Sequence, residues 1–228
     1  GESPFIRGKK TGGNNWKVRQ DIKVTDYAEA NIKAIKLIES GVDSLGFYLT
    51  VPESITAGNI ELLLRKINPE AVELNFLSDG KAKELVDAFI ENVKSYSPGK
   101  ITGAVETDPL SRLMLNGTLC IPVEKGFDYL AGVAEKTLPL PGFRALHINA
   151  SVFRNAGTDI VTELAFAIAM GAEYLQRFAE RGISPEVASR KIRFSFGTGS
   201  EYLPEIAKLR AARLLWSVVL NKVMPGKN

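Results

Sequence analysis

Short apolar runs alternate with amphipathic helical stretches from about residue 26 onward. Such alternation is typical of βα units, in which each strand of a parallel sheet is followed by a helix. The pattern therefore predicts an α/β fold. We expect strands at Asp43–Tyr48, Ala71–Phe76, Ile101–Val105, Phe143–Asn149 and Lys191–Phe196.

The helices between these runs have recognisable beginnings and ends. Asp26 can cap a helix that runs to Ser40, and Asp79–Gly80 can open another. Ser184–Glu186 supplies a cap, a proline at the first helical position and an early carboxylate. The longest candidate, about Thr158–Arg181, is apolar around most of its circumference, which predicts packing on more than one side.

Periodicity alone does not choose between an open doubly wound sheet and a barrel. Ala145, His147 and Asn149 share one face of their strand, while Leu146 and Ile148 share the other. In a barrel, the apolar face would meet the helices and the polar face would look inward. The predicted strands are too few for eight and the chain begins without methionine, so we expect a piece of a longer protein.

Composition narrows the classes of function. The 29 Lys plus Arg and 26 Asp plus Glu give a formal charge of +3, spread along the chain, which does not favour a nucleic-acid partner. No apolar run approaches the roughly 20 residues that span a bilayer, so we expect a soluble protein without a membrane partner.

The single cysteine, Cys120, suits a reducing cytoplasm, and we expect it to be a small buried apolar side chain rather than a thiol nucleophile. With His147 as the one histidine, we expect no metal site.

Two glycine-containing turns lie at the ends of predicted strands. Gly197–Ser200 precedes a helix, so its amides could face a phosphate group. A dinucleotide fingerprint needs a third glycine where this chain has Tyr202, and a tight turn is the simpler interpretation. Asn155–Thr158 lies where barrel active sites occur, but no acid or base stands beside it.

Several ionisable residues have both a chemical and a structural interpretation. Glu106 and Asp108 could serve as acid and base, but Asp108 before Pro109 also predicts a helix cap. His147 could shuttle protons, or it could fill a barrel interior beside a polar neighbour. The last helix carries charges that we expect to face solvent or an interface: Glu201, Glu205, Lys208, Arg210 and Arg213.

Three stretches carry longer motifs, in the same order as in a known family. Trp16–Gln20 fits W-x-x-R-Q, and Asn155–Glu163 with Met170–Tyr174 is similar to E-A-G-A…D-I-E…D-G-V-E-Y. Arg193–Phe196 and Glu205–Trp216 are similar to R-L-S-F-F…E-I-A-K-x-R-A-A-R-x-L-W. Together they resemble the barrel domain of the methylmalonyl-CoA mutase family over nearly the whole chain.

The resemblance implies a (β/α)8 TIM-type barrel that is incomplete in this chain. Residues 1–25 would form an N-terminal arm leading into the barrel, and residues 26–228 a partial acyl-CoA mutase-like barrel. In the family, a separate C-terminal domain holds adenosylcobalamin for a radical rearrangement of an acyl-CoA that threads the barrel. The D-x-H-x-x-G motif of that domain is absent, so we expect no cofactor in this chain and adenosylcobalamin in its parent complex.

The chain departs from the family at positions that hold the substrate. A catalytic Tyr-His pair falls at Ser151 and Val152, whose side chains cannot replace its hydrogen bonds to the thioester. A substrate-contacting Gln falls at Glu106, a Thr at Ala104 and an Arg at Asn116. Because this reaction depends on accurate positioning, we expect the chain not to carry out the isomerisation by itself.

Further departures concern the arm and the tunnel. The stretch from Arg7 to Trp16 is shorter than in the family and lacks its T-M-Y segment. His147 and Asn149 stand where the catalytic chain has serines lining its tunnel, so we expect larger side chains to fill the barrel.

Three hypotheses follow. The first is a non-catalytic small subunit that pairs with the catalytic large subunit of the mutase and that self-associates when alone. The second is an acyl-CoA mutase barrel of altered specificity, which binds a CoA thioester through Glu106 and Asn116. The third, an unrelated phosphate-binding barrel enzyme, depends only on Gly197–Ser200.

Overall fold

A computed structural model describes residues 16–50, 55–78 and 80–225. The chain divides into two compact units, each treated separately below. Trp16–Thr107 and Tyr129–His147 form what we call the sheet unit. Asp108–Asp128 and Ile148–Asn228 belong to what we call the helical unit.

The sheet unit is built on five strands in the order β1-β2-β3-β4-β5, and all neighbouring pairs are parallel. The predicted α/β class is therefore correct, and the observed strand bounds differ from the predicted ones by up to two residues. β1 lies within residues 1–25, which the family resemblance assigns to the N-terminal arm and barrel entry. The predicted strand 143–149 is divided at Ala145 into β5 and β6. The strands of this sheet are β1 Arg19–Val24, β2 Ser44–Leu49, β3 Glu73–Ser78, β4 Gly103–Val105 and β5 Phe143–Arg144.

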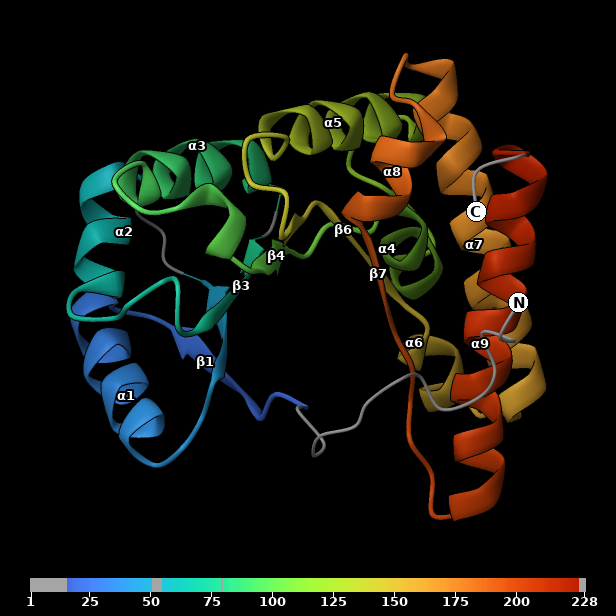
Figure 1. The fold of residues 1–228 in the computed structure, drawn as a ribbon, viewed down its shortest axis with the longest axis horizontal. Coiled ribbons are helices and arrows are strands. Elements are labelled where there is room, and N and C mark those ends of the chain that lie inside the picture. Colours follow the sequence, from blue (N-terminus) through green and yellow to red (C-terminus); the bar gives the residue numbers. More distant parts are fainter. Residues whose placement is uncertain (1–15, 51–54, 79, 226–228) are drawn as a thin grey trace. The chain divides into compact units, whose positions relative to one another are not determined.

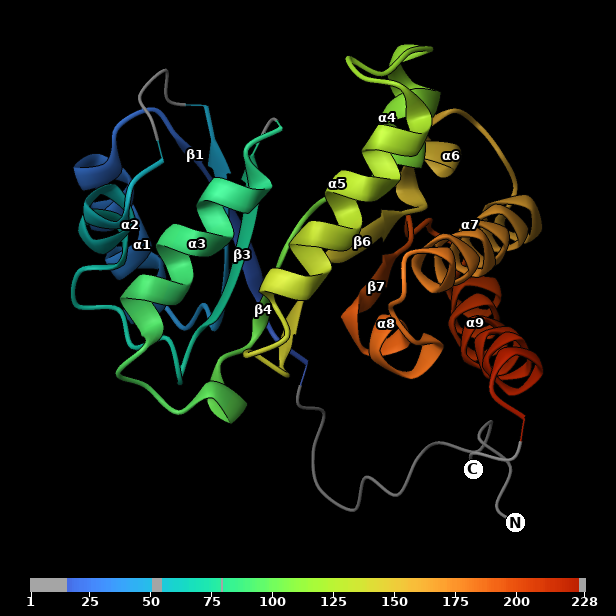
Figure 2. The ribbon, with the colours of Figure 1, turned by 90° about the horizontal axis from the view of Figure 1, so that it is seen from above.

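The helices α1 Tyr27–Glu39, α2 Ala57–Leu64 and α3 Ala82–Val93 lie on one side of these strands (Figure 2). The short 3-10 helix η1, Pro98–Lys100, precedes β4. The predicted cap of α1 is confirmed, because the carboxylate of Asp26 accepts a hydrogen bond from the Glu29 amide at 2.8 Å. α3 has Lys81 at its N-cap, and the alternative cap Asp79 lies outside the described residues.

Strand register gives this sheet one apolar and one polar face. Ile22, Phe47, Phe76 and Val105 lie side by side in neighbouring strands and are all at most 5% exposed. Phe76 contacts Phe89 of α3 with ring centroids 5.2 Å apart, so this row is the face that the helices cover. The alternate row carries polar and small residues, because successive side chains of a strand point to opposite faces. We call this second face the helix-free face of the sheet unit.

Two of the boundaries between the units fall within elements, namely α5 Val123–Lys136 and β6 Leu146–Asn149. β6 pairs with β7, Ile192–Ser195, in a two-stranded sheet. Side chains in β6 alternate as predicted, with Leu146 and Ile148 buried and His147 and Asn149 half-buried. The remaining helices of the helical unit are α4 Pro109–Asn116, α6 Ser151–Asn155, α7 Ile160–Glu180, α8 Pro185–Lys191 and α9 Tyr202–Val223.

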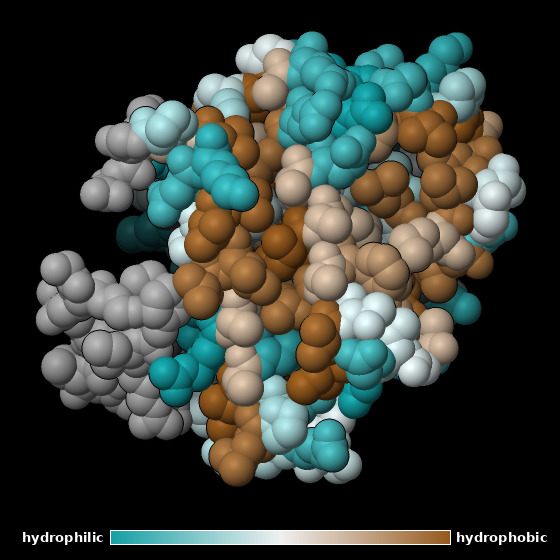
Figure 3. Space-filling model, turned by 90° about the vertical axis from the view of Figure 1, so that its right-hand side faces the viewer, coloured by the Kyte–Doolittle hydropathy of each residue, from teal (hydrophilic) through white to brown (hydrophobic). Residues whose placement is uncertain are grey.

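The long helices α7 and α9 pack against each other (Figure 1). The sequence predicts that the helix at α7 is the longest, but its 21 residues are one fewer than the 22 of α9. α9 carries both apolar and charged residues around its circumference, and its apolar residues Tyr202 and Leu203 are 76% and 74% exposed. Figure 3 shows hydrophobic side chains gathered over much of the face that includes this helix.

Cys120 is an exposed free cysteine, so the prediction of a buried apolar side chain is wrong. It lies between α4 and α5, in a connection whose local sequence does not form a strand or helix that could bury it. Among the described residues, no helix is both long enough and apolar enough to cross a membrane.

Candidate functional site

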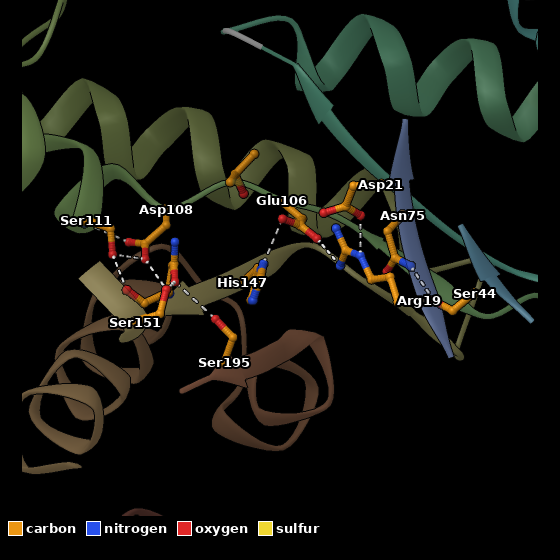
Figure 4. A network of polar contacts seen from close by, with 12 residues as sticks. Arg19, Asp21, Ser44, Asn75, Glu106, Asp108, Ser111, His147, Ser151 and Ser195 are labelled. Carbon is orange, nitrogen blue, oxygen red and sulfur yellow. Dashed lines mark hydrogen bonds and ion pairs between the residues drawn. The ribbon is translucent and has the colours of Figure 1, made fainter. Parts of the chain in front are cut away.

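A chain of ion pairs crosses the helix-free face of the sheet unit (Figure 4). Arg19 of β1 donates from Nε to Asp21 Oδ1 at 2.7 Å and from Nη1 to Glu106 Oε1 at 2.6 Å. On the other side of Glu106, Oε2 lies 2.9 Å from Nδ1 of His147. We call Arg19, Asp21, Glu106 and His147 the inner network. It links residues that are up to 128 positions apart in the sequence, from 19 to 147.

The inner network keeps Glu106 ionised. Burial of this carboxylate raises its pKa, but the hydrogen bonds and charges of His147 and Arg19 outweigh burial and lower the pKa to about 2. Burial lowers the pKa of Arg19, but the charges of Glu106 and Asp21 outweigh it and raise that pKa. Both carboxylate oxygens of Glu106 are engaged by nitrogen donors, so this residue is not available as a general acid.

The backbone of β2 makes room for the inner network. Asp21, Gly46, Asn75 and Ala104 lie side by side in successive strands. A Cβ atom at Gly46 would lie 1.9 Å from Asp21 Oδ1 and 2.8 Å from an Arg19 nitrogen. Only glycine at this position lets the Arg19 side chain cross the sheet face toward Glu106.

A second polar cluster lies near the beginning of the same strands. Asn75, fully buried, donates to Ser44 Oγ at 3.1 Å and to the Leu45 carbonyl at 3.2 Å. Glu73 accepts from Ser44 at 3.2 Å and lies 3.4 Å from the Lys17 ammonium. Polar side chains therefore cover this face from the strand starts to Glu106.

Asp108 is the hub of a separate network in the helical unit (Figure 4). It accepts from the Ser111 amide at 3.0 Å, which confirms the predicted cap of α4. It also accepts from the Asn149 amide at 3.0 Å and from the hydroxyl of Tyr174. Burial, together with the charge of Asp108, raises the pKa of Tyr174 well above its usual value. Asp108 thus holds α4, β6 and α7 together, and its oxygens are occupied by donors.

The other predicted positions of the helical unit are not gathered around a reactive group. Ser151, in the first turn of α6, donates to Asn149 Oδ1 at 2.5 Å, and Ser195 donates to the same oxygen at 3.2 Å. Val152 is half-buried in the same turn, and Asn116 is exposed at the last position of α4. The turn after α6, Asn155–Thr158, carries no acid or base. The segment that would replace the family's T-M-Y, residues 8–15, lies outside the described residues.

The Gly197–Ser200 loop is bound to carboxylates of its own chain. The Gly197 amide donates to Glu163 Oε1 at 2.6 Å, and the Gly199 amide donates to Glu205 Oε1 at 2.9 Å. Glu205 and Lys208 are 7% and 3% exposed, so the prediction that they face solvent or an interface is wrong. The sequence of α9 does not predict this burial, because Glu163, the buried carboxylate that pairs with Lys208, lies on another helix.

Sequence reasoning found part of the inner network. It identifies Glu106 and His147, together with Ala104, which lies on the same face outside the network, whereas it misses the contacts of Arg19 and Asp21. The signal that could have identified them is the sequence R-Q-D-I-K-V of residues 19–24. Its polar residues 19, 21 and 23 fall on one face of a strand, and its apolar residues 22 and 24 fall on the other. Among the described residues, no group of three or more His, Cys, Asp or Glu side chains could hold a metal ion.

The parallel strands, their one-sided helical cover and the polar face define an α/β domain of the kind built from βα units. The chain belongs to the methylmalonyl-CoA mutase family, since the model of the family described as methylmalonyl-CoA mutase matches residues 55–228.

The relatives are about three times as long as this chain, and each is named as a methylmalonyl-CoA mutase or its small subunit. The methylmalonyl-CoA mutase small subunit of Porphyromonas gingivalis is 40% identical over 223 residues, covering 96% of this chain and 35% of the relative. The small subunit of Streptomyces virginiae is 30% identical over 96% of this chain and 36% of its own. The methylmalonyl-CoA mutase of Rhizobium meliloti is 25% identical over 100% of this chain and 36% of its own. The chain thus spans about a third of the length of these relatives.

Proposed function

We propose that this chain is the barrel part of the non-catalytic small subunit of an adenosylcobalamin-dependent methylmalonyl-CoA mutase. In this role it pairs with the large subunit, which isomerises methylmalonyl-CoA and succinyl-CoA. In this proposal residues 26–228, together with β1 of the entry segment 1–25, form part of a (β/α)8 barrel. The similarity to two small subunits, at 40% and 30% identity, supports the assignment.

The single observation that carries the proposal is the inner network. In a barrel, the helix-free face of the strands is the interior, through which the family's acyl-CoA threads. Arg19, Glu106 and His147 occupy that face with direct contacts of 2.6 and 2.9 Å. Inserting a pantetheine arm would require breaking these ion pairs in a partly buried setting, which is costly because each partner would lose its counter-charge.

The residues that could contact a thioester are already committed or unsuitable. Glu106 is ionised and held by two nitrogen donors, so it repels a developing negative charge. Ser151 donates to Asn149, and Val152 has no polar group. The altered-specificity hypothesis needs Glu106 to be free, and the inner network gives it no support.

Adenosylcobalamin does not fit the residues of this chain. The family motif that holds it contains a histidine, and the one histidine here has its Nδ1 bound to Glu106, with the side chain 11% exposed. We infer that the parent complex holds the cofactor outside this chain, and that the chain contributes a scaffold.

Turnover and binding assays test the proposal. We expect no succinyl-CoA above a no-protein control when the 228-residue chain is incubated with adenosylcobalamin and methylmalonyl-CoA. Titration with a CoA thioester should show no saturable binding, and addition of a catalytic large subunit should give a stable complex. Turnover by this chain alone, or saturable thioester binding that Glu106→Gln abolishes, would favour the enzyme hypothesis.

A further inference from the structure

Four charged side chains surround the loop that follows β7, and the proposed function uses none of them. Glu163 of α7 and Lys208 of α9 have side chains that are 0% and 1% exposed, and their charged atoms are 2.7 Å apart. Glu205, 9% exposed, places Oε2 at 2.6 Å from the same ammonium. Arg154 adds a second positive charge, 4.0 Å from Glu205. The group contains two carboxylates and two cations, so its charges balance.

The same side chains also bind the backbone of the Gly197–Ser200 loop. Glu163 accepts from the Gly197 amide at 2.6 Å, and Glu205 accepts from the Gly199 amide at 2.9 Å. Lys208 donates to the Gly197 carbonyl at 2.6 Å. The amides that a phosphate oxygen would need are therefore taken by carboxylate oxygens. Lys208, the buried cation beside the loop, is neutralised by the same two carboxylates.

Glu205 and Lys208 stay charged around neutral pH. Burial lowers the pKa of Lys208, but hydrogen bonds and charges from Glu163 and Glu205 outweigh burial and raise it. The hydrogen bond from Lys208, and then that from the Gly199 amide, lower the pKa of Glu205. A free phosphate ion would have to displace a carboxylate that is tethered to the loop by the chain and so has a high effective concentration.

We propose that Glu163, Glu205 and Lys208 form an internal lock that closes the Gly197–Ser200 loop to phosphate groups. The loop has the glycine content and position of an anion-binding turn, and the lock supplies that anion from within the chain. Glu205 is the part of the lock that can be removed with least damage, because Glu163 still compensates Lys208.

Inorganic phosphate is the probe, titrated into the 228-residue chain at constant ionic strength with chloride as reference. In the wild-type chain, the NMR amide signals of Gly197 and Gly199 should show no saturable change. Glu205→Ala frees the Gly199 amide and one side of Lys208. Phosphate should then raise the midpoint of thermal unfolding saturably, by about 2–5 °C beyond the effect of chloride.

Two variants separate the lock from general charge effects. Glu205→Gln keeps an oxygen that accepts from the Gly199 amide, so it should stay closed to phosphate. Glu201→Ala removes an exposed carboxylate at the start of the same helix and should behave as wild type. Saturable phosphate shifts of Gly197 or Gly199 in the wild-type chain would overturn the lock, as would equal responses of Glu205→Ala and Glu201→Ala. The wild-type titration tests the lock even if Glu205→Ala does not fold.

Discussion

Glu106 shows how one carboxylate is specialised by its neighbours. Its pKa falls from the usual 4.5 to about 2 because Arg19 and His147 stabilise the ionised form more than burial disfavours it. A carboxylate with a lowered pKa stabilises the folded state above its unfolded pKa and loses that contribution as the pH falls through its folded pKa. The window for Glu106 therefore runs from about pH 4.5 down to about pH 2.

We expect Glu106→Gln to weaken the dependence of the free energy of unfolding on pH in the acid range. The wild-type free energy of unfolding should fall more steeply between pH 4.5 and 2 than that of the variant, by roughly 3 kcal/mol at most. Urea unfolding at a series of pH values measures the difference. Glu201→Gln, which removes one exposed carboxylate, is the charge-matched control. Parallel profiles for wild type and Glu106→Gln would mean that the ion pairs do not persist in solution.

Tyr174 is a second residue whose role depends on contacts far away in the sequence. Its hydroxyl donates to Asp108 and accepts from the Leu110 amide at 2.9 Å, while its ring packs edge-on against Phe127 at 5.9 Å. Tyr174→Phe keeps the ring but removes one donor to Asp108 and the acceptor of the Leu110 amide, both of which are half-buried. We expect a loss of about 1–3 kcal/mol in the free energy of unfolding.

The matched control is Tyr202→Phe, because Tyr202 is 76% exposed and the same change there should cost almost nothing. Equilibrium unfolding in denaturant measures both variants. Equal stability of the two would contradict the role of Asp108 as a hub.

Residue by residue, the sequence predicts local interactions better than distant ones. The caps at Asp26, Asp108 and Ser184 follow from neighbouring amides and are all confirmed. His147 was expected beside a polar neighbour on the inward-facing side of its strand, but the identity of Glu106 as that neighbour depends on the alignment of β4 with a strand 41 positions later. The burial of Glu205 and Lys208 depends on Glu163, on a different helix, and no local pattern contains it.

At the scale of elements, β1 is the main feature that the sequence pattern left out. Its charged residues Arg19, Asp21 and Lys23 resemble an exposed arm when counted alone. They belong to a strand because Ile22 and Val24, buried at 5% and 0% exposure, alternate with them. β4 and β5 are only three and two residues long, so their periodicity is too short to fix their ends.

Three glycines of the sheet unit differ in the space that is available for a side chain. At Gly103, where φ is +144°, a Cβ would lie 1.8 Å from the Leu74 carbonyl oxygen. At Gly46 the nearest atom is the movable carboxylate of Asp21, and at Gly58 of α2 nothing lies within 4 Å. We expect Gly103→Ala to cost more than about 3 kcal/mol, Gly46→Ala about 1–2 kcal/mol, and Gly58→Ala to be neutral or stabilising.

Denaturant unfolding of the three variants gives the order directly. Gly58→Ala is the internal control, because helix propensity alone favours alanine there. A Gly46→Ala variant as stable as wild type would show that Arg19 and Asp21 can leave the helix-free face without cost. That result would remove the main support for a filled interior.

On the scale of the whole molecule, two kinds of surface have features that are usually buried: apolar side chains on α7 and α9, and the outer strands of the five-stranded sheet. α9 exposes Tyr202, Leu203 and Leu209, with Leu209 47% exposed, while α7 exposes Val161 and Phe166 at 71% and 44%. In the described part of the sheet unit, β1 and β5 are the outer strands of the five-stranded sheet. Apolar patches and strand edges of this kind both promote association.

We therefore expect the chain, when alone, to self-associate with increasing concentration. Light scattering at micromolar concentrations should give a mass above the 24.9 kDa of one chain. The variant Leu203→Glu places a charge on the apolar face of α9, where the side chain is 74% exposed and replaceable without disturbing the fold. It should lower the associated fraction severalfold while leaving the midpoint of unfolding nearly unchanged, because exposed substitutions usually alter stability by less than about 0.5 kcal/mol.

The control is Lys222→Glu, on the same helix but at an exposed charged position. It should associate as wild type does once its charge change is matched by salt. A monomer at every concentration would contradict the prediction, and association that is insensitive to Leu203→Glu would point to the strand edges instead of α9. If the proposed function is right, binding of the large subunit should compete with self-association for the same face, because one apolar surface cannot be covered twice.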